Sequence, residues 1–150
     1  VKVFREIIKQ EPNSLLLLVG DGPDRVKIEK MVNAYGLQNK VRFLGQRSDV
    51  SNLYQAMDAL VLPSHFEGLC IVAIEAQMAD LPCICSEALT AETKVTPNYI
   101  SLSLDLSSVD WAIKVLEQKG KIRTDNTTRL RVAGYDAEAE IVRLEKLYQK

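Results

Sequence analysis

The chain has 150 residues, of which 47% are hydrophobic and 26% are charged, and its net charge is −1. A chain of this length buries roughly 70% of its extended surface on folding, so it can form one hydrophobic core without disulfide support. The near-neutral charge provides no broad basic field, which argues against nucleic acid as a partner. The longest apolar runs, residues 15–19 and 69–74, are far shorter than the ~18 residues of a transmembrane segment.

The three cysteines cannot all be paired in a disulfide framework, and no signal-peptide pattern opens the chain. Both features favour a reducing, cytoplasmic location. Cys83 and Cys85 are two residues apart on an apolar run, so we expect them on one face of a strand. Because no further Cys or His completes a ligand set, we interpret them as small buried residues and expect no metal site.

Short apolar runs alternate with amphipathic stretches along the chain. Continuous apolar runs are typical of strands buried on both faces of a parallel sheet. They predict strands at residues 15–19, 41–44, 59–62, 82–85 and 100–104. The amphipathic stretches predict helices at about residues 3–8, 24–35, 50–57, 69–79, 108–119 and 136–149, with a polar connection at 121–128. This alternation predicts an α/β, doubly wound, Rossmann-like domain with a three-layer αβα parallel sheet.

A glycine turn follows the first predicted strand. Gly20 and Gly22 are candidates for phosphate binding, because a turn at a helix N-terminus offers free N–H groups and the positive end of the helix dipole. The third glycine of a dinucleotide-binding motif would fall at Arg25, so that motif is absent. The alternative interpretation is a tight strand-to-helix connection with Pro23 at the first helical position.

A stronger candidate site follows the strand that ends at Pro63. The helix after it is predicted to open near Leu69, so the amides of Gly68, Leu69 and Cys70 could bind an anion such as a diphosphate. Glu75 lies six residues further along, about 9 Å at 1.5 Å per residue, which suits the ribose hydroxyls of a nucleotide. Glu67, on the loop, could bind the group that the diphosphate carries. The alternatives are a helix-capping acid at Glu67 and a solvated helix charge at Glu75.

Several ordered motifs together resemble the nucleotide-sugar half of retaining GT-B glycosyltransferases, and most closely the capsular and exopolysaccharide enzymes of the glycosyl transferases group 1 family. The resemblance extends from residue 1 to about residue 116. The motifs that carry it are Pro63-Ser64-x-x-Glu67-Gly68-Leu69, Glu75-Ala76-Gln77, Leu17-Leu18-Val19-Gly20-Asp21-Gly22-Pro23 and Val41-Arg42-Phe43-Leu44-Gly45.

The resemblance implies a role for each matching position. Glu67 becomes the catalytic residue that reaches the donor sugar, the amides of residues 68–70 contact the sugar or diphosphate, and Glu75 holds the ribose. Backbone groups near Arg47 and Val50 contact the base, although Ser48 or Asp49 could also simply cap the following helix. The implied reaction transfers a hexose from a UDP- or GDP-sugar with retained configuration, and protein donors rather than a metal ion stabilise the leaving diphosphate.

The chain departs from the family pattern at two positions, with Cys70 where proline is common and Asp80 where glycine is common. Asp80 must accept the backbone geometry of its turn, and aspartate can adopt the left-handed conformation. The first strand, the Arg and Lys that neutralise the diphosphate, and the acceptor-binding domain are expected upstream, in a longer two-domain enzyme. We therefore expect the sheet either to close without that strand or to leave an open edge, and the isolated chain to be inactive.

The resemblance also implies that the C-terminal helix, residues 136–149, packs on the acceptor-binding domain through a stripe of Ile141, Leu144 and Tyr148. The acidic run at 136, 138 and 140 is interpreted as a solvated face of this helix. The full-length enzyme is expected to act in the cytoplasm, with peripheral association at the inner face of the membrane.

Two other functions are compatible with the residues. The chain could be a non-catalytic nucleotide or protein interaction module. It could also be a sugar-nucleotide epimerase of related fold, although such enzymes are expected to carry further catalytic acids and histidines. The single histidine, His65, lies beside Glu67, but no partner is positioned for it, and we interpret it as a loop residue.

Overall fold

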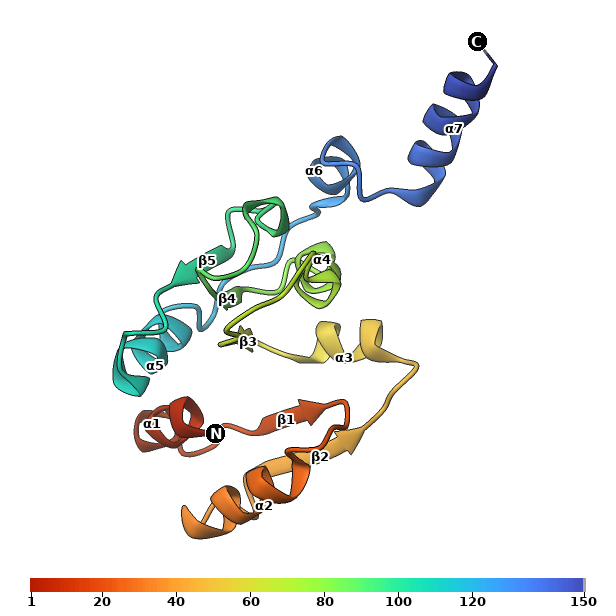
Figure 1. Ribbon diagram of the computed structural model, residues 1–150. Helices are drawn as coiled ribbons and strands as arrows, with labels where there is room; N and C mark the ends of the chain where they lie inside the picture. The colour runs from red at the N-terminus through yellow and green to blue at the C-terminus, as the bar shows by residue number, and fades with distance from the viewer. Residues whose placement is uncertain (150) are drawn as a thin grey trace. The chain divides into compact units, whose positions relative to one another are not determined.

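The structure, a computed structural model, describes residues 1–149 (Figure 1). Helices and strands alternate along the chain as the sequence predicts, and the five strands pair only in parallel. The elements are α1 (Lys2–Gln10), β1 (Leu16–Val19), α2 (Arg25–Ala34), β2 (Val41–Gly45), α3 (Val50–Ala56), β3 (Leu60–Leu62), α4 (Ile71–Met78), β4 (Cys83–Ser86), η1 (Ala91–Thr93), β5 (Tyr99–Leu102), α5 (Ser108–Leu116), α6 (Thr127–Val132) and α7 (Ala137–Tyr148). They form two compact units, one of Val1–Val50 with Asp105–Glu117 and one of Ser51–Leu104 with the chain from Gln118 onward.

The first unit contains the parallel pair β1 and β2 and the helices α1, α2 and α5. Helix α1 packs against α5, so the segment after β5 returns to the beginning of the chain (Figure 1). A capping box starts α5, in which Ser107 and Asp110 each accept a hydrogen bond from the other's backbone amide. Apolar side chains from the three helices, from β2 and from the connection before it form the core of this unit, with Phe4, Ile7, Val32, Leu37, Val41 and Ala112 buried.

The second unit contains a three-stranded parallel sheet in the order β3-β4-β5. All four residues of the central strand β4 are buried, including Cys83 and Cys85, as expected for small core residues. Helix α4 packs on β4 through Ala73 and Ala76, which are completely buried and allow a close approach between helix and strand. The loop that leaves the carboxyl end of β3 leads directly into α4, and the candidate site begins on this loop.

The expectation that every strand is buried on both faces is confirmed for β4 and is wrong for β1. Leu15, just before β1, is half exposed, residues 16–18 are half-buried and Val19 is exposed. Within residues 1–149, β1 has a hydrogen-bonded neighbour only on the β2 side, so its other edge is open. The described strands therefore form two parallel sheets rather than one that closes directly, which is the open-edge alternative.

The turn between α4 and β4 contains a left-handed residue at Asp80, where the family pattern commonly has glycine. Asp80 has φ of 49°, its amide donates to the Gln77 carbonyl at 3.0 Å, and the Leu81 amide donates to the Ala76 carbonyl at 3.0 Å. This is a Schellman motif, in which glycine is usual and aspartate is tolerated. Asp80 is nevertheless buried, which no pattern in the sequence indicates.

The stretch 121–128 is more than a polar connection, because α6 begins within it and Leu130 of that helix is completely buried. Helix α6 has only six residues, too few for apolar periodicity to predict it. Asp136 does not belong to a solvated face, because it caps α7 by accepting from the Ala139 amide at 3.0 Å and also pairs with Arg131 at 2.7 Å. No helix within residues 1–149 combines the length and apolar character required to cross a membrane.

Candidate functional site

The loop after β3 and the start of α4 present the candidate diphosphate-binding amides. Helix α4 opens at Ile71, two residues later than predicted, because Cys70 at the N-cap has a non-helical backbone with ψ of 85°. No side chain caps this end. Within residues 1–149, the amides of Gly68, Leu69 and Cys70 donate no hydrogen bond to the protein. These donors lie at the positive end of the helix dipole, which is the arrangement that binds an anion.

The side chains around these amides divide into exposed and buried ones. Glu67 and Leu69 are exposed, whereas Cys70 is buried. Burial raises the pKa of the Cys70 thiol, so the thiol stays protonated and apolar in character. Cys70 can therefore offer a ligand its backbone amide but not a thiolate. His65, beside Glu67, is an exposed loop residue, in keeping with its interpretation from the sequence.

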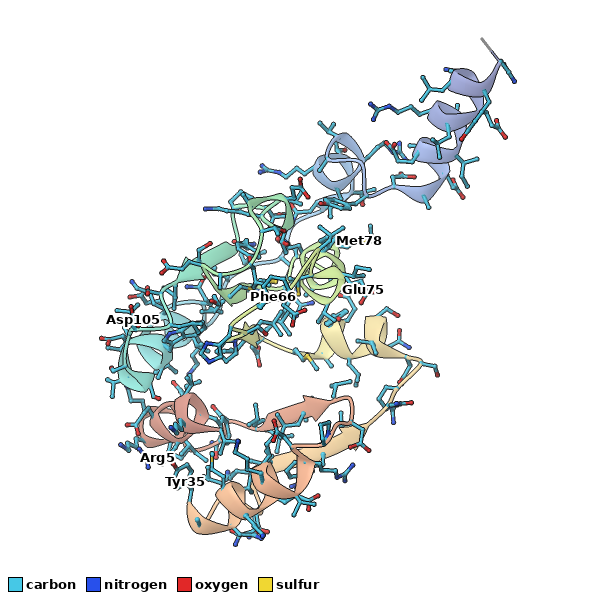
Figure 2. The ribbon with its side chains drawn as sticks, in the orientation of Figure 1. Arg5, Tyr35, Phe66, Glu75, Met78 and Asp105 are labelled. Atoms are coloured by element: carbon cyan, nitrogen blue, oxygen red, sulfur yellow. The ribbon has the colours of Figure 1, made fainter. Side chains whose placement is uncertain are left out.

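Glu75 lies on α4 with an exposed side chain (Figure 2). Its Oε2 atom accepts a hydrogen bond of 3.2 Å from the hydroxyl of Tyr54, a buried residue of α3. Burial and the nearby Glu75 carboxylate raise the pKa of Tyr54, so its phenol remains a proton donor. The carboxylate is thus partly held by the protein and partly available to a ligand.

The glycine turn after β1 uses the amides that were candidates for phosphate binding. The Gly20 amide donates to the Gly45 carbonyl at 2.7 Å, and the Gly22 amide donates to the Asp21 carboxylate at 2.9 Å. Gly20 has φ of 108°, a conformation that requires glycine. Pro23 is not the first helical residue as predicted, because α2 begins at Arg25 and Pro23 lies in the preceding turn. These contacts are those of a tight strand-to-helix connection.

The candidate base-binding residues follow β2. The Arg47 guanidinium pairs with both carboxylate oxygens of Asp49 at 2.8 and 2.6 Å, so this carboxylate is engaged in an ion pair. Val50 is the first residue of α3. Arg47, Val50, Gly20 and Gly22 belong to the first unit, whereas Glu67, residues 68–70 and Glu75 belong to the second. The structure therefore places Glu67, residues 68–70 and Glu75 within one unit.

Sequence patterns did not indicate two residues near this group, Tyr54, which bonds Glu75, and Arg123, which bonds the Tyr54 carbonyl. Tyr54 lies 21 positions from Glu75 in the chain, and Arg123, which binds the C-terminal end of α3, lies in the stretch that was interpreted as a polar connection. A buried tyrosine has the same sequence pattern whether its hydroxyl bonds a functional carboxylate or a carbonyl. No group of three or more metal-ligating side chains occurs in the part of the chain that the structure describes.

A parallel α/β domain with an open helix N-terminus at a strand's carboxyl end is of the Rossmann-like class, and its fold is that of solved glycosyltransferases. One is the pneumococcal O-GlcNAc transferase GtfA in complex with UDP and GlcNAc, with TM-score 0.78, 17% identity and coverage of 99% of this chain and 31% of that one. Another is Anabaena HepE in complex with UDP, with TM-score 0.76, 24% identity and coverage of 99% and 44%. The predicted fold class, the Rossmann-like half of a GT-B glycosyltransferase, is confirmed.

The model of the family "Glycosyl transferases group 1" matches residues 1–110, and the chain belongs to this family. The protein EpsF of Bacillus subtilis (strain 168) is 32% identical over 137 residues, 89% of this chain and 36% of that protein. The UDP-Gal:alpha-D-GlcNAc-diphosphoundecaprenol alpha-1,3-galactosyltransferase of Escherichia coli is 28% identical over 144 residues, 91% of this chain and 37% of that protein. The chain thus spans a little over a third of the length of these relatives.

Proposed function

We propose that the chain is the donor-binding domain of a retaining, metal-independent glycosyltransferase. The enzyme transfers a hexose from a nucleotide diphosphate sugar to a saccharide or lipid-linked acceptor in polysaccharide biosynthesis. The observation that carries this proposal is the arrangement on α4, where unpaired amides at the N-terminus and an exposed carboxylate at Glu75 lie on one helix. Family membership supports it, as does the Escherichia coli relative, whose name specifies a UDP-sugar donor and a lipid-linked acceptor.

Each residue of the site then has a role that its chemistry suits. The amides of Gly68, Leu69 and Cys70 bind the diphosphate, whose negative charge they stabilise as it leaves. The Glu75 carboxylate accepts hydrogen bonds from the ribose hydroxyls, and Glu67 is the catalytic residue that reaches the donor sugar. Backbone groups near Arg47 and Val50 remain the proposed contacts of the base, whereas the amides of Gly20 and Gly22 already donate to Gly45 and Asp21.

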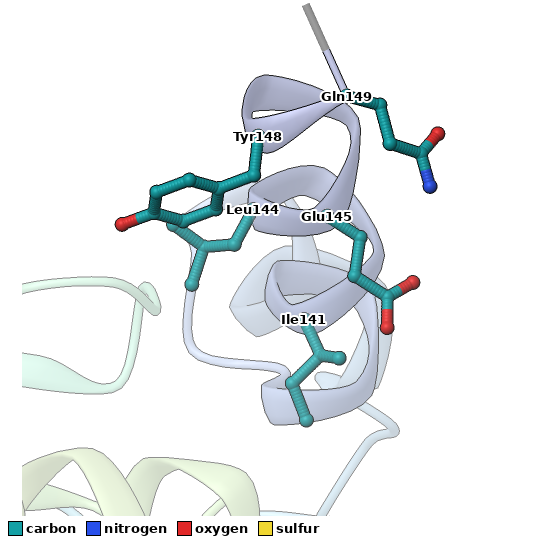
Figure 3. A pocket seen from close by; sticks show the side chains of 5 residues that line it. All are labelled: Ile141, Leu144, Glu145, Tyr148 and Gln149. Carbon is teal, nitrogen blue, oxygen red and sulfur yellow. The ribbon is translucent and has the colours of Figure 1, made fainter.

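The proposal extends to helix α7 at the C-terminal end of the described residues. Helix α7 has no buried residue along Ala137–Tyr148, and Ile141, Leu144 and Tyr148 are all exposed. Leu144 and Tyr148 project from one side of the helix (Figure 3). We propose that this stripe packs on the acceptor-binding domain, and that the complete enzyme works in the cytoplasm at the inner face of the membrane.

We expect the chain to bind UDP or GDP, and the Glu75→Ala variant to bind that nucleotide about 10- to 100-fold more weakly. The physical reason is that hydrogen bonds to a charged group contribute roughly 1.5–3 kcal/mol. Isothermal titration calorimetry with each nucleotide measures the effect. Glu87→Ala is the matched control, because it removes an exposed carboxylate from the same unit without touching α4. The proposal is contradicted if the parent chain binds neither nucleotide, or if Glu75→Ala binds as tightly as the parent.

A further inference from the structure

The Glu75 carboxylate is anchored through one of its two oxygens. Oε2 accepts the 3.2 Å hydrogen bond from the Tyr54 hydroxyl. Oε1 accepts no hydrogen bond from any other residue in the range 1–149. Since a carboxylate has about four lone-pair sites, this arrangement orients the group and leaves most of its acceptor capacity open to a ligand.

Tyr54 is itself held in place. Its side chain is only 3% exposed, and its backbone carbonyl accepts a 3.0 Å hydrogen bond from the Arg123 guanidinium. The same guanidinium donates to the carbonyls of Met57 and, at 3.3 Å, of Ala79. These carbonyls follow the ends of α3 and α4, so Arg123 ties the two helix ends together. The distance between the Tyr54 hydroxyl and Glu75 is thereby maintained.

An exposed glutamate on a helix ordinarily samples several rotamers, and ordering such a side chain costs up to about 2 kcal/mol. A donor fixed on a neighbouring helix reduces that cost before the ligand arrives, which increases affinity by preorganisation. Tyr54 suits this role because burial raises the pKa of its phenol, so the hydroxyl remains protonated and donates over the whole physiological pH range.

We infer that Tyr54 is a positioning residue for nucleotide binding, an inference that rests on the proposed function. Its hydroxyl holds the Glu75 carboxylate in the orientation that receives the two ribose hydroxyls, and Arg123 keeps α3 at the correct distance from α4. The residue touches no ligand itself. It acts only through Glu75, and therefore only on the part of the affinity that the ribose hydroxyls contribute.

The test compares UDP with 2′,3′-dideoxy-UDP, which lacks those hydroxyls, by titration calorimetry on the 150-residue chain. If the chain binds GDP rather than UDP, GDP and 2′,3′-dideoxy-GDP are used instead. The readout is the dissociation constant of the dideoxy nucleotide divided by that of UDP, which measures what the ribose hydroxyls contribute to affinity. Tyr54→Phe is expected to reduce this ratio about 3- to 10-fold, the size of the net contribution of one ordinary hydrogen bond, because the hydroxyl acts only through Glu75. The affinity for the dideoxy nucleotide should be unchanged. A merely structural role for Tyr54 would weaken both nucleotides alike, and that result would overturn the inference.

Two further variants complete the design. Tyr99→Phe is the matched control, because Tyr99 is another buried tyrosine of the same unit and its hydroxyl bonds Cys85; its ratio should equal that of the parent. Adding Tyr54→Phe to Glu75→Ala should change the ratio no further. If the ratio is unchanged in Tyr54→Phe but falls to about one in Glu75→Ala, the inference is overturned and the proposed function stays intact. A parent-like ratio in Glu75→Ala would instead refute the ribose assignment.

Arg123→Lys tests the same inference with the tyrosine in place. Lysine keeps the charge but cannot donate to three carbonyls in the planar geometry of a guanidinium. The expected result is a smaller nucleotide ratio than in the parent, with an unchanged affinity for the dideoxy nucleotide. A parent-like ratio in this variant would overturn the role of Arg123.

Discussion

Replacing Asp80 with alanine is expected to lower the free energy of unfolding by about 3 kcal/mol or more, because hydrogen bonds to a charged acceptor contribute roughly 1.5–3 kcal/mol each. The Asp80 carboxylate accepts from Asn98 at 2.6 Å, from Asn126 at 2.5 Å, and from both the amide and the hydroxyl of Thr124, the latter at 2.9 Å. Alanine leaves these groups without their acceptor, and Asn126 is buried. Alanine retains a Cβ at the left-handed φ of 49°, so this substitution does not relieve the roughly 1–2 kcal/mol that the backbone conformation costs.

Two companion variants separate the causes. Asp80→Gly loses the same hydrogen bonds but accepts the backbone geometry, so it should be more stable than Asp80→Ala by about 1 kcal/mol. Asp80→Asn retains an acceptor oxygen and tolerates the left-handed region, so it isolates the loss of charge. Urea unfolding followed by far-ultraviolet circular dichroism measures all three. Equal stability of the alanine variant and the parent would show that this carboxylate does not hold the second unit together.

The same carboxylate makes stability depend on pH. Burial alone would raise the pKa of Asp80, but the hydrogen bonds from Thr124, Asn98 and Asn126 outweigh it and hold the pKa below the ordinary value of 3.8. A lowered folded-state pKa stabilises the fold above the unfolded pKa, and this stabilisation disappears as the pH falls through the folded value. The free energy of unfolding should therefore decline below about pH 4, and part of that decline should be absent in Asp80→Asn.

The second large effect is expected at Gln77, whose replacement by leucine should lower the free energy of unfolding by about 4 kcal/mol, since each buried polar group left unpaired costs roughly 1–3 kcal/mol. Gln77 is completely buried. Its amide nitrogen donates to the Thr93 carbonyl at 2.7 Å, and its oxygen accepts from the amides of Val95 at 3.0 Å and Thr96 at 2.9 Å. Leucine has a similar volume but leaves these backbone groups unsatisfied.

Urea unfolding measures the loss in free energy of unfolding for Gln77→Leu and for its control, Gln149→Leu. Gln149 is exposed at the end of α7, so the same change there should alter stability by about 0.5 kcal/mol or less. A loss of that small size at Gln77 would mean that water or a local rearrangement satisfies the freed groups. The loss expected for Gln77→Leu is a large fraction of the roughly 5–15 kcal/mol that typically stabilises a whole domain.

Much of the fold follows from short-range patterns. The sequence predicts all five described strands and six of the seven described α-helices, and most of their ends differ from the prediction by one to three residues. The agreement is good because apolar runs and helical periodicity act within a few residues. The departure from the family's glycine at Asp80 identified a turn position with special backbone geometry, and the structure gives this residue a left-handed φ of 49°. The helix after Pro63 was predictable, as was the placement of Glu75 on it.

The sequence by itself therefore determined the α/β class, the order of the elements and the spacing of Glu67, residues 68–70 and Glu75 along one loop and helix. Only the tertiary structure decided that the Tyr54 hydroxyl donates to Glu75, which is 21 positions away in the chain. The same holds for the Asn126 amide, which donates to Asp80 over 46 positions. The tertiary structure also decided that β1 keeps an open edge among the described strands. The reason is physical: periodicity records which face of an element is apolar, whereas the partner of a buried polar group depends on which distant segments the packed core brings within hydrogen-bonding distance.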